Sequence, residues 1–471
     1  MISVEAEDIK RAMSQENPWW GEFSELSGKY SELKRRQFLP EVKKLVMRES
    51  PNREVILLGP RRVGKTVLIH HLIESLQSDE GVEASRILYL QIDNPLYVGM
   101  SLVQLLEYYQ EITGYDWRSK KCFIFFDEIQ YLNDWELHLK SIHDEGGASR
   151  FTATGSAQAA LSRGSKESGA GRFTDFILPP LLFREYLHFK GREGLVEEDD
   201  EGYFATDIDA LNQDLLDYVN FGGYPEIALS EIGSSEASRY MRTDILDKVL
   251  LRDLPSLYGI HDVRDLNRLF TMLAFNSGHE LNLEDLSQSS QVSKNTIKRY
   301  LDYLEASFLI RRMHRVDQNA KRFKRDHTFK VYLTNSSIRT GLFSSMHMQS
   351  EQLGHAVETA VIAQRFHQMS EYLHYARWKS GRVFHEVDVV RMDAGMQLTH
   401  ATEVKFTDRV VKQKSSWQPW IGFCEKNGLD NLTVTTKTVQ ESVSVGRVKI
   451  HFEPTAVYLY RVGEISYGKD F

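Results

Sequence analysis

The sequence predicts an α/β fold in which a parallel sheet is covered by helices on both of its faces. Between residues 54 and 156, short apolar runs alternate with longer amphipathic segments. This alternation is typical of strand–helix–strand units, which bring their strands into one parallel sheet. The runs are continuously apolar, as expected for strands that are buried on both faces.

The expected elements alternate along the chain. Strands are expected at 54–59, 86–92, 120–129 and 150–156, and helices at 66–77, 101–113 and 135–145. Residues 1–50 have a polar, helical pattern with a basic stretch at Lys34, Arg35 and Arg36, which we interpret as a solvated helix beside the sheet. Residues 193–214 are strongly acidic, which favours an exposed insertion loop.

Composition limits the classes of protein that this chain can represent. At 471 residues it is too long for one hydrophobic core, so several domains are expected. Hydrophobic residues make up 41% and charged residues 26%, a mixture that argues against wholesale disorder. The two cysteines, Cys122 and Cys424, rule out a disulfide framework or a cysteine zinc site and fit a reducing compartment.

Charge and apolar patterning bear on location and partners. The formal net charge of −8 gives no overall attraction to nucleic acid, so such binding requires a local basic patch. The N-terminus has no signal-peptide pattern, and no run approaches the roughly 18 apolar residues of a membrane helix. We therefore expect a cytoplasmic protein without a membrane partner.

A glycine-rich motif lies between the first expected strand and the first expected helix. Residues 59–66, GPRRVGKT, match the phosphate-loop pattern G-x-x-x-x-G-K-[ST]. The glycines let backbone N–H groups turn toward phosphate oxygens, and the helix adds the positive end of its dipole. Lys65 is expected to neutralise the β- and γ-phosphates, and the Thr66 hydroxyl to ligate Mg²⁺.

This context predicts a RecA-like P-loop ATPase core that binds ATP and Mg²⁺. The expected nucleotide-binding residues are Gly59, Pro60, Arg61, Arg62, Val63, Gly64, Lys65, Thr66, Val67 and Asp127.

Two acids end the third expected strand, FIFFDE. Asp127 is expected to hold the Mg²⁺ through water, and Glu128 to polarise the attacking water as a general base. The alternative is that both acids only cap the following turn. The complete phosphate loop upstream favours the catalytic interpretation.

Two further residues are candidates for a catalytic role. The last expected strand ends in Thr154, Gly155 and Ser156, and we favour Ser156 over Thr154 as the side chain that senses the γ-phosphate. Arg172 follows a glycine- and serine-rich segment, and two interpretations stay open for it. It is either a finger that acts on the nucleotide of a neighbouring subunit in a homo-oligomer, or an ordinary surface arginine.

Several motifs together resemble a known family. GPRRVGKT, FFDEIQ, TGS, GRFTDFILPPLLFREYL and YVNFGGYPEIAL are similar to those of prokaryotic AAA-type ATPases that carry an uncharacterised C-terminal domain. The resemblance covers residues 30 to 410 and implies an ATPase core, a helical lid, a winged helix and a restriction-endonuclease-like fold. The corresponding domains are expected at 1–50 (N-terminal helical segment), 51–190 (core), 191–261 (lid with the acidic insertion), 262–340 (winged helix) and 341–471 (restriction-endonuclease-like).

Residues 281–315 have a helix–turn–helix pattern followed by a strand. Ser293 is the expected N-cap of the second helix, whose outer face carries donors for bases and phosphates. A basic loop follows. The candidate DNA contacts are Lys294, Asn295, Lys298, Arg299, Lys321, Arg322, Lys324 and Arg325. The alternative is that the module serves protein contacts only.

Carboxylates recur in the C-terminal region in the order of a PD-(D/E)xK nuclease motif. Glu358 lies on an expected helix, Asp388 on a strand, and Glu403 and Lys405 on the next strand, where residues two apart share a face. A hairpin between the two strands would bring Asp388 alongside Glu403 and Lys405. The acids Glu358, Asp388 and Glu403 are therefore candidate ligands of a second Mg²⁺ or Mn²⁺, with Lys405 as the catalytic lysine.

Two functions are compatible with these motifs. The first is an ATP-regulated DNA-processing enzyme with a metal-dependent nuclease domain. The second is a nucleotide-dependent switch or scaffold, in which the carboxylates form an inert cluster of buried ion pairs and the domain binds a protein partner.

Overall fold

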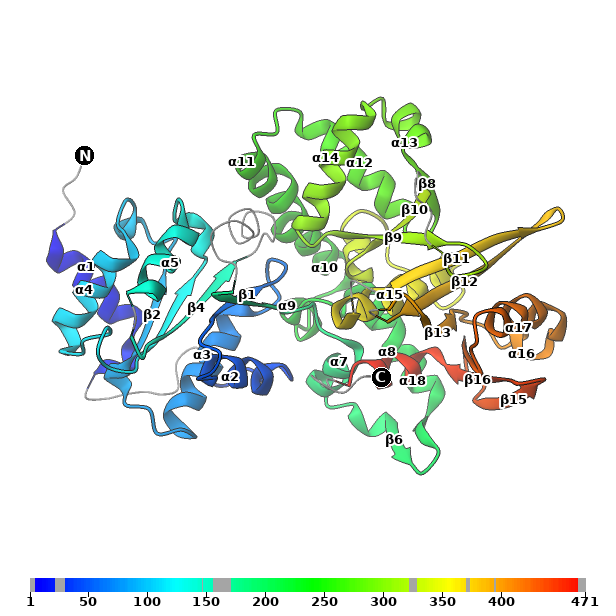
Figure 1. Cartoon of the computed structure of the whole chain (residues 1–471), viewed down its shortest axis with the longest axis horizontal. Helices are drawn as coiled ribbons and strands as arrows, with labels where there is room; N and C mark the ends of the chain where they lie inside the picture. Colours follow the sequence, from blue (N-terminus) through cyan, green and yellow to red (C-terminus); the bar gives the residue numbers. More distant parts are fainter. Residues whose placement is uncertain are drawn as a thin grey trace. The chain divides into compact units, whose positions relative to one another are not determined.

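The computed structural model describes residues 5–21, 30–145, 147–155, 171–321, 328–369, 373–393 and 395–464. The chain divides between Pro179 and Pro180 into two compact units, each of which is described by itself (Figure 1). Among the described residues, no helix combines the length and the apolar composition that crossing a bilayer requires.

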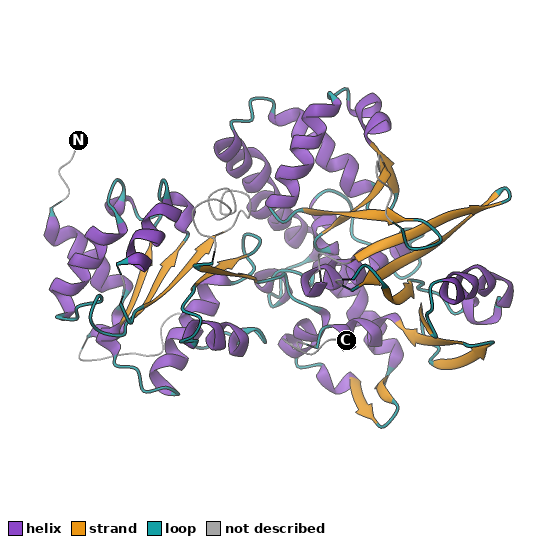
Figure 2. Ribbon diagram, viewed as in Figure 1, coloured by secondary structure: helices purple, strands orange, loops and turns teal. Residues whose placement is uncertain are grey.

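A parallel sheet forms the centre of the first unit, with helices on both of its faces (Figure 2). Its strand order is β2-β3-β4-β1-β5 and every neighbouring pair is parallel. The strands are β1 (Glu54–Leu58), β2 (Ile87–Gln91), β3 (Phe123–Asp127), β4 (Arg150–Gly155) and β5 (Phe173–Ile177). The helices are α1 (Ala6–Glu16), α2 (Leu39–Met47), α3 (Lys65–Ser78), α4 (Leu102–Thr113) and α5 (Trp135–Asp144), with 3₁₀ turns at Pro18–Trp20, Ala84–Arg86, Pro95–Tyr97 and Ile129–Tyr131.

The predicted α/β class and the parallel sheet of the P-loop core are confirmed. Every residue of β1, β3 and β4 is buried, as expected for strands that are covered on both faces. The sequence pattern assigned no strand to β5. Its parallel pairing with β1 makes it the fifth strand of the sheet.

The N-terminal segment is part of the first unit's structure. Asn17 is buried, and its side-chain amide donates to the carbonyl of Tyr89 (2.8 Å) and accepts from the N–H of Tyr89 (2.7 Å). The indole N–H groups of Trp19 and Trp20 both donate to the carbonyl of Ile87. These side chains satisfy backbone groups along the edge strand β2, which would otherwise be unpaired.

The second unit is built on a nine-stranded mixed sheet with the order β15-β16-β14-β13-β12-β11-β9-β10-β8. Its strands are β8 (Glu280–Asn282), β9 (Ile310–Val316), β10 (Thr328–Leu333), β11 (Leu373–Ser380), β12 (Val383–Met392), β13 (Leu398–Glu403), β14 (Asn431–Thr436), β15 (Glu441–Val445) and β16 (Val448–Pro454). The parallel pairing of β9 with β11 joins the antiparallel strands β8, β10 and β9 to the rest of the sheet.

Helices pack on both faces of this sheet. One hydrophobic core joins sheet residues such as Tyr375 and Val389 to α7 (Phe183–Lys190), α8 (Ile208–Phe221), α15 (Leu353–Met369) and α18 (Thr455–Val462). A second core joins the sheet to α17 (Trp417–Lys426). The remaining helical elements are α9 (Pro225–Ala228), α10 (Ser234–Tyr240), α11 (Leu254–Tyr258), α12 (Val263–Phe275), α13 (Leu283–Ser290), α14 (Lys294–Ala306), α16 (Arg409–Lys412) and the short turns or π-helical stretches at Glu193–Leu195, Met241–Leu246, Val249–Asp253, Ser336–Gly341 and Lys414–Ser416.

The elements from α12 to β10 form a module with the order helix, strand, helix, helix, strand, strand. We call it the α12–β10 module (residues 263–333). Gln291 takes a left-handed conformation between α13 and α14, and the Ser293 side chain accepts a hydrogen bond from the N–H of Thr296 as the N-cap of α14. The boundary expected between residues 340 and 341 separates two parts that share one sheet.

The acidic stretch 193–214 is more than the expected exposed loop. Strands β6 (Val196–Asp199) and β7 (Gly202–Ala205) pair as an antiparallel hairpin, and α8 begins at Ile208. Tyr203 of the hairpin contacts the ring of Tyr460, with 5.6 Å between ring centroids, and its hydroxyl donates to Glu464. Apolar and aromatic residues between the acids therefore fix this segment on α18.

Candidate functional site

The loop of residues 59–64 joins β1 to α3 and has the conformation that phosphate binding requires. Gly59 and Gly64 have φ angles of 154° and 92°, in a region that side chains rarely adopt. A Cβ atom on Gly59 would lie 2.4 Å from the carbonyl oxygen of Leu178. The glycines therefore let the loop close in front of the N-terminus of α3, where an anion is favourably bound.

Lys65 begins α3 and is buried. Its ammonium donates to the carbonyl oxygens of Gly59 and Pro60, each at 3.0 Å. Burial lowers the pKa of Lys65, while the charges of Glu128 and Asp127 act in the opposite direction. The ammonium lies inside the curve of the loop, where the phosphates of a nucleotide would be its natural counter-charge.

The other predicted nucleotide-binding residues of the loop and of α3 are close to Lys65 in sequence. Pro60 and Val63 are buried, Arg61 and Arg62 are partly exposed, and Val67 lies in the first turn of α3.

Asp127 ends β3 beside the start of α3 and is 2% exposed. Its Oδ2 atom accepts hydrogen bonds from Thr66 Oγ1 (2.7 Å) and from the hydroxyl of Tyr89 (2.8 Å), and Oδ1 accepts one from Thr154. The hydroxyl and carboxylate that P-loop proteins use to hold Mg²⁺ are therefore adjacent here. These residues fit a Mg–nucleotide.

Glu128 follows in a left-handed backbone conformation, with φ of 54°. Its carboxylate accepts a hydrogen bond from Gln130, and burial raises its pKa, an effect that Lys65 opposes. Its N–H donates to Thr154 Oγ1 (3.0 Å). Thr154 therefore forms hydrogen bonds with both Asp127 and Glu128. Ser156, the residue favoured from the sequence, lies outside the described residues.

Arg172 lies at the amino ends of the strands, whereas the loop lies at their carboxyl ends. It precedes β5, whose Phe173 pairs with Glu54 at the start of β1, whereas the loop follows the end of β1. A five-residue strand spans about 17 Å, so Arg172 does not reach the loop of its own chain. Its guanidinium donates instead to Asp144, with 2.8 Å between Nε and Oδ1.

Arg36 is a residue of the nucleotide site that the sequence did not reveal. The basic stretch was expected to be solvated, but Arg36 is 4% exposed. Its guanidinium donates to the carbonyls of Val63 (2.6 Å) in the loop and Pro179 (2.9 Å). The expectation of solvation was wrong for this residue because its partners lie far away in sequence. Arg35, its neighbour, is exposed as expected.

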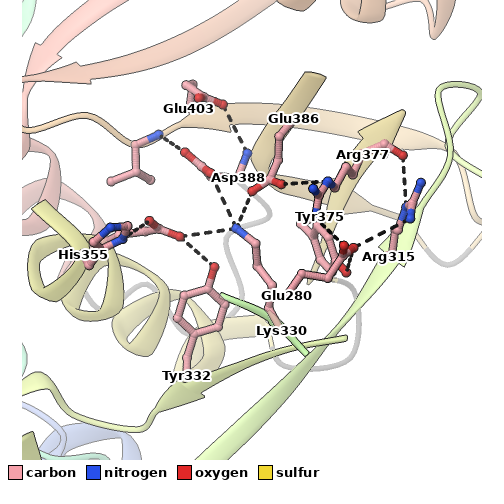
Figure 3. A network of polar contacts seen from close by, with 12 residues as sticks. Glu280, Arg315, Lys330, Tyr332, His355, Tyr375, Arg377, Glu386, Asp388 and Glu403 are labelled. Atoms are coloured by element: carbon pink, nitrogen blue, oxygen red, sulfur yellow. Dashed lines mark hydrogen bonds and ion pairs between the residues drawn. The ribbon is translucent and has the colours of Figure 1, made fainter. Parts of the chain in front are cut away.

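Four acids and two lysines of the second unit form a network of buried and partly buried charges, and Figure 3 shows the part of it around Lys330. We call it the carboxylate cluster, and it consists of Glu358, Glu386, Asp388, Glu403, Lys330 and Lys405.

One half of the cluster lies on the β12–β13 hairpin, which pairs Val389 with Thr402. Asp388 accepts a hydrogen bond from the N–H of Val404 (2.9 Å), and its own N–H donates to Glu403 (3.3 Å). The Lys405 ammonium lies 3.4 Å from Asp388 Oδ2 and 2.6 Å from Glu403 Oε1. The three residues of the predicted nuclease motif therefore converge.

The other half is organised by Lys330 of β10, which no motif indicated. Its ammonium lies 2.5 Å from Glu386, 3.6 Å from Glu358 and 3.8 Å from Asp388. The hydroxyl of Tyr332, two residues along the same strand, donates to Glu358 (2.8 Å). A lysine within the otherwise apolar run of β10 was the available signal.

Burial and mutual repulsion disfavour ionisation of the cluster's acids. Burial, reinforced by the charge of Asp388, raises the pKa of Glu358 to about 7 and that of Glu403 to about 8. Burial also opposes ionisation of Asp388, but the ammonium groups of Lys405 and Lys330 hold its pKa below the usual value. Burial therefore opposes the ionisation of Glu358 and Glu403, whereas the two ammonium groups favour that of Asp388.

The cluster fits a metal ion only in its hairpin half. Among the described residues, no set of three or more histidine, cysteine or acidic side chains is arranged to hold a metal. Lys330 lies between Glu358 and Asp388, so these two predicted ligands do not face a common open position. Asp388 and Glu403 do converge on one cation, the ammonium of Lys405, which is 36% exposed.

A cavity of about 410 Å³ lies beside Glu358. Among its lining residues are Arg339, His279 and His355, and the two imidazole rings are 4.8 Å apart. Nδ1 of His355 lies 3.9 Å from Glu358 Oε2. His355 therefore both lines this cavity and approaches Glu358 of the cluster.

The predicted DNA contacts on α14 are on its outer face. Lys294, Asn295, Lys298 and Arg299 are all exposed, and Lys294 forms an ion pair with Glu284. Lys321 is also exposed. Arg322, Lys324 and Arg325 lie outside the described residues.

Two family models match separate parts of the chain. Residues 51–187 match an AAA domain, and residues 212–349 match a domain of unknown function, DUF8612. Together with the loop geometry, the first match shows that the N-terminal unit has an AAA-type nucleotide-binding fold.

Curated relatives match little more than half of the chain. Uncharacterized protein MJ1544 of Methanocaldococcus jannaschii is 24% identical over 265 residues, which are 55% of this chain and 56% of the relative. An uncharacterized protein of Haemophilus influenzae is 25% identical over 60% of this chain and 68% of its own length. MJ1637 of M. jannaschii is 27% identical over 63% of this chain and 64% of its own length.

Solved structures resemble the chain only distantly. The ORC1 protein of Aeropyrum pernix in complex with DNA has a TM-score of 0.32 at 12% identity, over 67% of this chain and 94% of its own. Cdc6p of Pyrobaculum aerophilum has a TM-score of 0.28 at 10% identity, over 67% and 95%.

Arg36 provides a test of the nucleotide site. We expect Arg36→Met to weaken MgATP binding about thirtyfold, because the loss of charge-assisted hydrogen bonds worth about 2 kcal/mol detaches the loop carbonyl of Val63 from that of Pro179. Arg35→Met, a change of the exposed neighbour, is the matched control and should leave the Kd within twofold. Isothermal titration calorimetry measures both. Equal affinities would show that Arg36 does not shape the loop.

Proposed function

We propose that the first unit binds and hydrolyses ATP. The observation that carries this proposal is the hydrogen bond between Thr66 and Asp127, with Glu128 next to it in the chain. Thr66 and Asp127 would hold Mg²⁺, which supplies charge neutralisation on the phosphates when it is bound. Lys65 would neutralise the β- and γ-phosphates.

Glu128 is the proposed general base. Its raised pKa brings its basicity closer to what proton abstraction from water requires near neutral pH. Thr154 holds the Glu128 backbone and the Asp127 carboxylate together and so fixes their relative position. Arg172 would complete the site only in a homo-oligomer, acting on the nucleotide of a neighbouring copy.

Two substitutions separate binding from chemistry. Lys65→Ala should abolish measurable MgATP binding, because the phosphates lose their buried counter-charge. Glu128→Gln should bind ATP normally but hydrolyse it at least about a hundredfold more slowly, since the base is lost. Glu107→Gln on the exposed face of α4 is the control. Phosphate release and calorimetry measure the two effects. Full turnover in Lys65→Ala would exclude this site.

We propose further that the nucleotide state is coupled to DNA binding by the α12–β10 module. This proposal is supported by the order of the module's elements, which is that of a winged helix, and by the exposed cationic residues of α14, which would be its recognition helix. The ion pair between Lys294 and Glu284 leaves Lys298 and Arg299 as the stronger candidates for phosphate contacts.

Salt dependence tests this proposal. The logarithm of DNA affinity should fall linearly with the logarithm of salt concentration, because phosphate contacts release counterions. Replacing both Lys298 and Arg299 by alanine should lower the magnitude of that slope by about 2. Lys44→Ala, an exposed lysine of the first unit, should leave it unchanged. Fluorescence anisotropy on labelled duplexes gives the slopes, and identical slopes would favour a module that contacts proteins only.

For the carboxylate cluster we propose metal-dependent cleavage of a phosphodiester. Asp388 and Glu403 would hold the divalent ion, which would polarise the phosphate, and Lys405 would stabilise the developing charge. The convergence of these three side chains supports this function. The second candidate is an inert cluster in a scaffold domain. It is favoured by the two lysines, which already compensate the acids without a metal.

Nuclease assays with Mg²⁺ or Mn²⁺ decide between the two. Asp388→Ala and Lys405→Ala should each lower the cleavage rate of single- or double-stranded DNA at least about a hundredfold. Asp430→Ala, an exposed acid of the same unit, should keep the native rate. The same background in all four proteins would end the nuclease proposal and leave the scaffold.

A further inference from the structure

We propose that Lys330 is a built-in second cation of the carboxylate cluster, which restricts the cluster to one divalent ion. Its ammonium takes the position of a second metal, and the remaining position lies between Asp388 and Glu403. This inference rests on the proposed metal-dependent function of the cluster and assigns a residue that no part of the nuclease motif contains.

The placement of Asp388 between two cations supports this assignment. Its Oδ1 atom faces Lys330 at 3.8 Å and its Oδ2 atom faces Lys405 at 3.4 Å. In two-metal sites the two ions are about 3.5–4 Å apart and act on the same phosphate. Here Asp388 is the shared acid, and its Oδ1 atom already faces the ammonium of Lys330.

Lys330 is held far more firmly than Lys405. Its side chain is 5% exposed, against 36% for Lys405. Strand β10 lies between β8 and β9, and Lys330 is paired with Glu280 on one side and Met313 on the other. Lys405 lies two residues beyond the end of β13. The Lys405 ammonium can therefore yield its place to a metal ion, whereas that of Lys330 is fixed.

Neighbouring side chains fix the acids around Lys330. Tyr332 donates to the same oxygen of Glu358 that faces Lys330. Arg377 lies 3.8 Å from Glu386 and is itself bound to Glu280, which also accepts from the Tyr375 hydroxyl (Figure 3). These contacts orient Glu358 and Glu386 toward the ammonium.

Counting bound Mn²⁺ tests the proposal on the full chain without nucleotide. The native protein should bind one Mn²⁺ per chain, and Lys330→Met should bind two, with spin coupling between the ions in electron paramagnetic resonance spectra. Lys330→Arg, which keeps a cation, and Lys379→Met, an exposed lysine of β11, should each bind one. A single Mn²⁺ of unchanged affinity in folded Lys330→Met would overturn the proposal.

Acid substitutions decide the matter if Lys330→Met does not fold. Glu403→Gln should weaken the single Mn²⁺ at least tenfold, whereas Glu358→Gln should change its affinity less than threefold, because Glu358 serves the lysine and not the metal. Equal losses in both variants would refute the assignment. Absence of Mn²⁺ binding in the native chain and in folded Lys330→Met would instead remove the proposed metal function itself.

Discussion

Burial of carboxylates is the constraint on which both units depend. An ionised acid that is removed from water must be given donors or positive charge, or it takes up a proton. The first unit gives Asp127 three hydroxyl donors, from Thr66, Tyr89 and Thr154, with the Lys65 ammonium nearby. The second unit places ammonium groups in direct contact with its acids.

The second arrangement also ties distant parts of the chain together. Lys330 and Tyr332 come from the α12–β10 module, whereas their acidic partners lie on α15 and β12. The parallel pairing of β9 with β11 brings these parts into one sheet. Movement of the module against the C-terminal strands would therefore separate opposite charges, which is unfavourable in a buried site.

Local patterns allowed much of the fold and the nucleotide site to be predicted. The phosphate loop, Asp127, Glu128 and the strands of the first sheet follow from residues that are close in sequence. The position of Asp388 opposite Glu403 follows from strand periodicity and a short connection, whereas Lys405, expected on the same strand, lies two residues beyond the end of β13. Arg36 and Lys330 could not be predicted in this way, because their partners are distant: Arg36 donates to Pro179, 143 residues away, and Lys330 pairs with Asp388 across strands β10 and β12. The sequence offers only weak signs of their roles: Lys330 is a charge within an apolar run, and Arg36 is one of three consecutive basic residues.

The shared sheet has a consequence for how this architecture can be inherited. A C-terminal nuclease-like part would be a convenient cassette for exchange between ATPases if it were self-contained. Here a recombination joint near residue 340 would deliver Glu358, Glu386 and Asp388 without Lys330, and would leave the edge of β11 without β9. A functional transfer would therefore have to carry the α12–β10 module along. Because Lys330 pairs with acids of the C-terminal part, the α12–β10 module and that part would have to be inherited together.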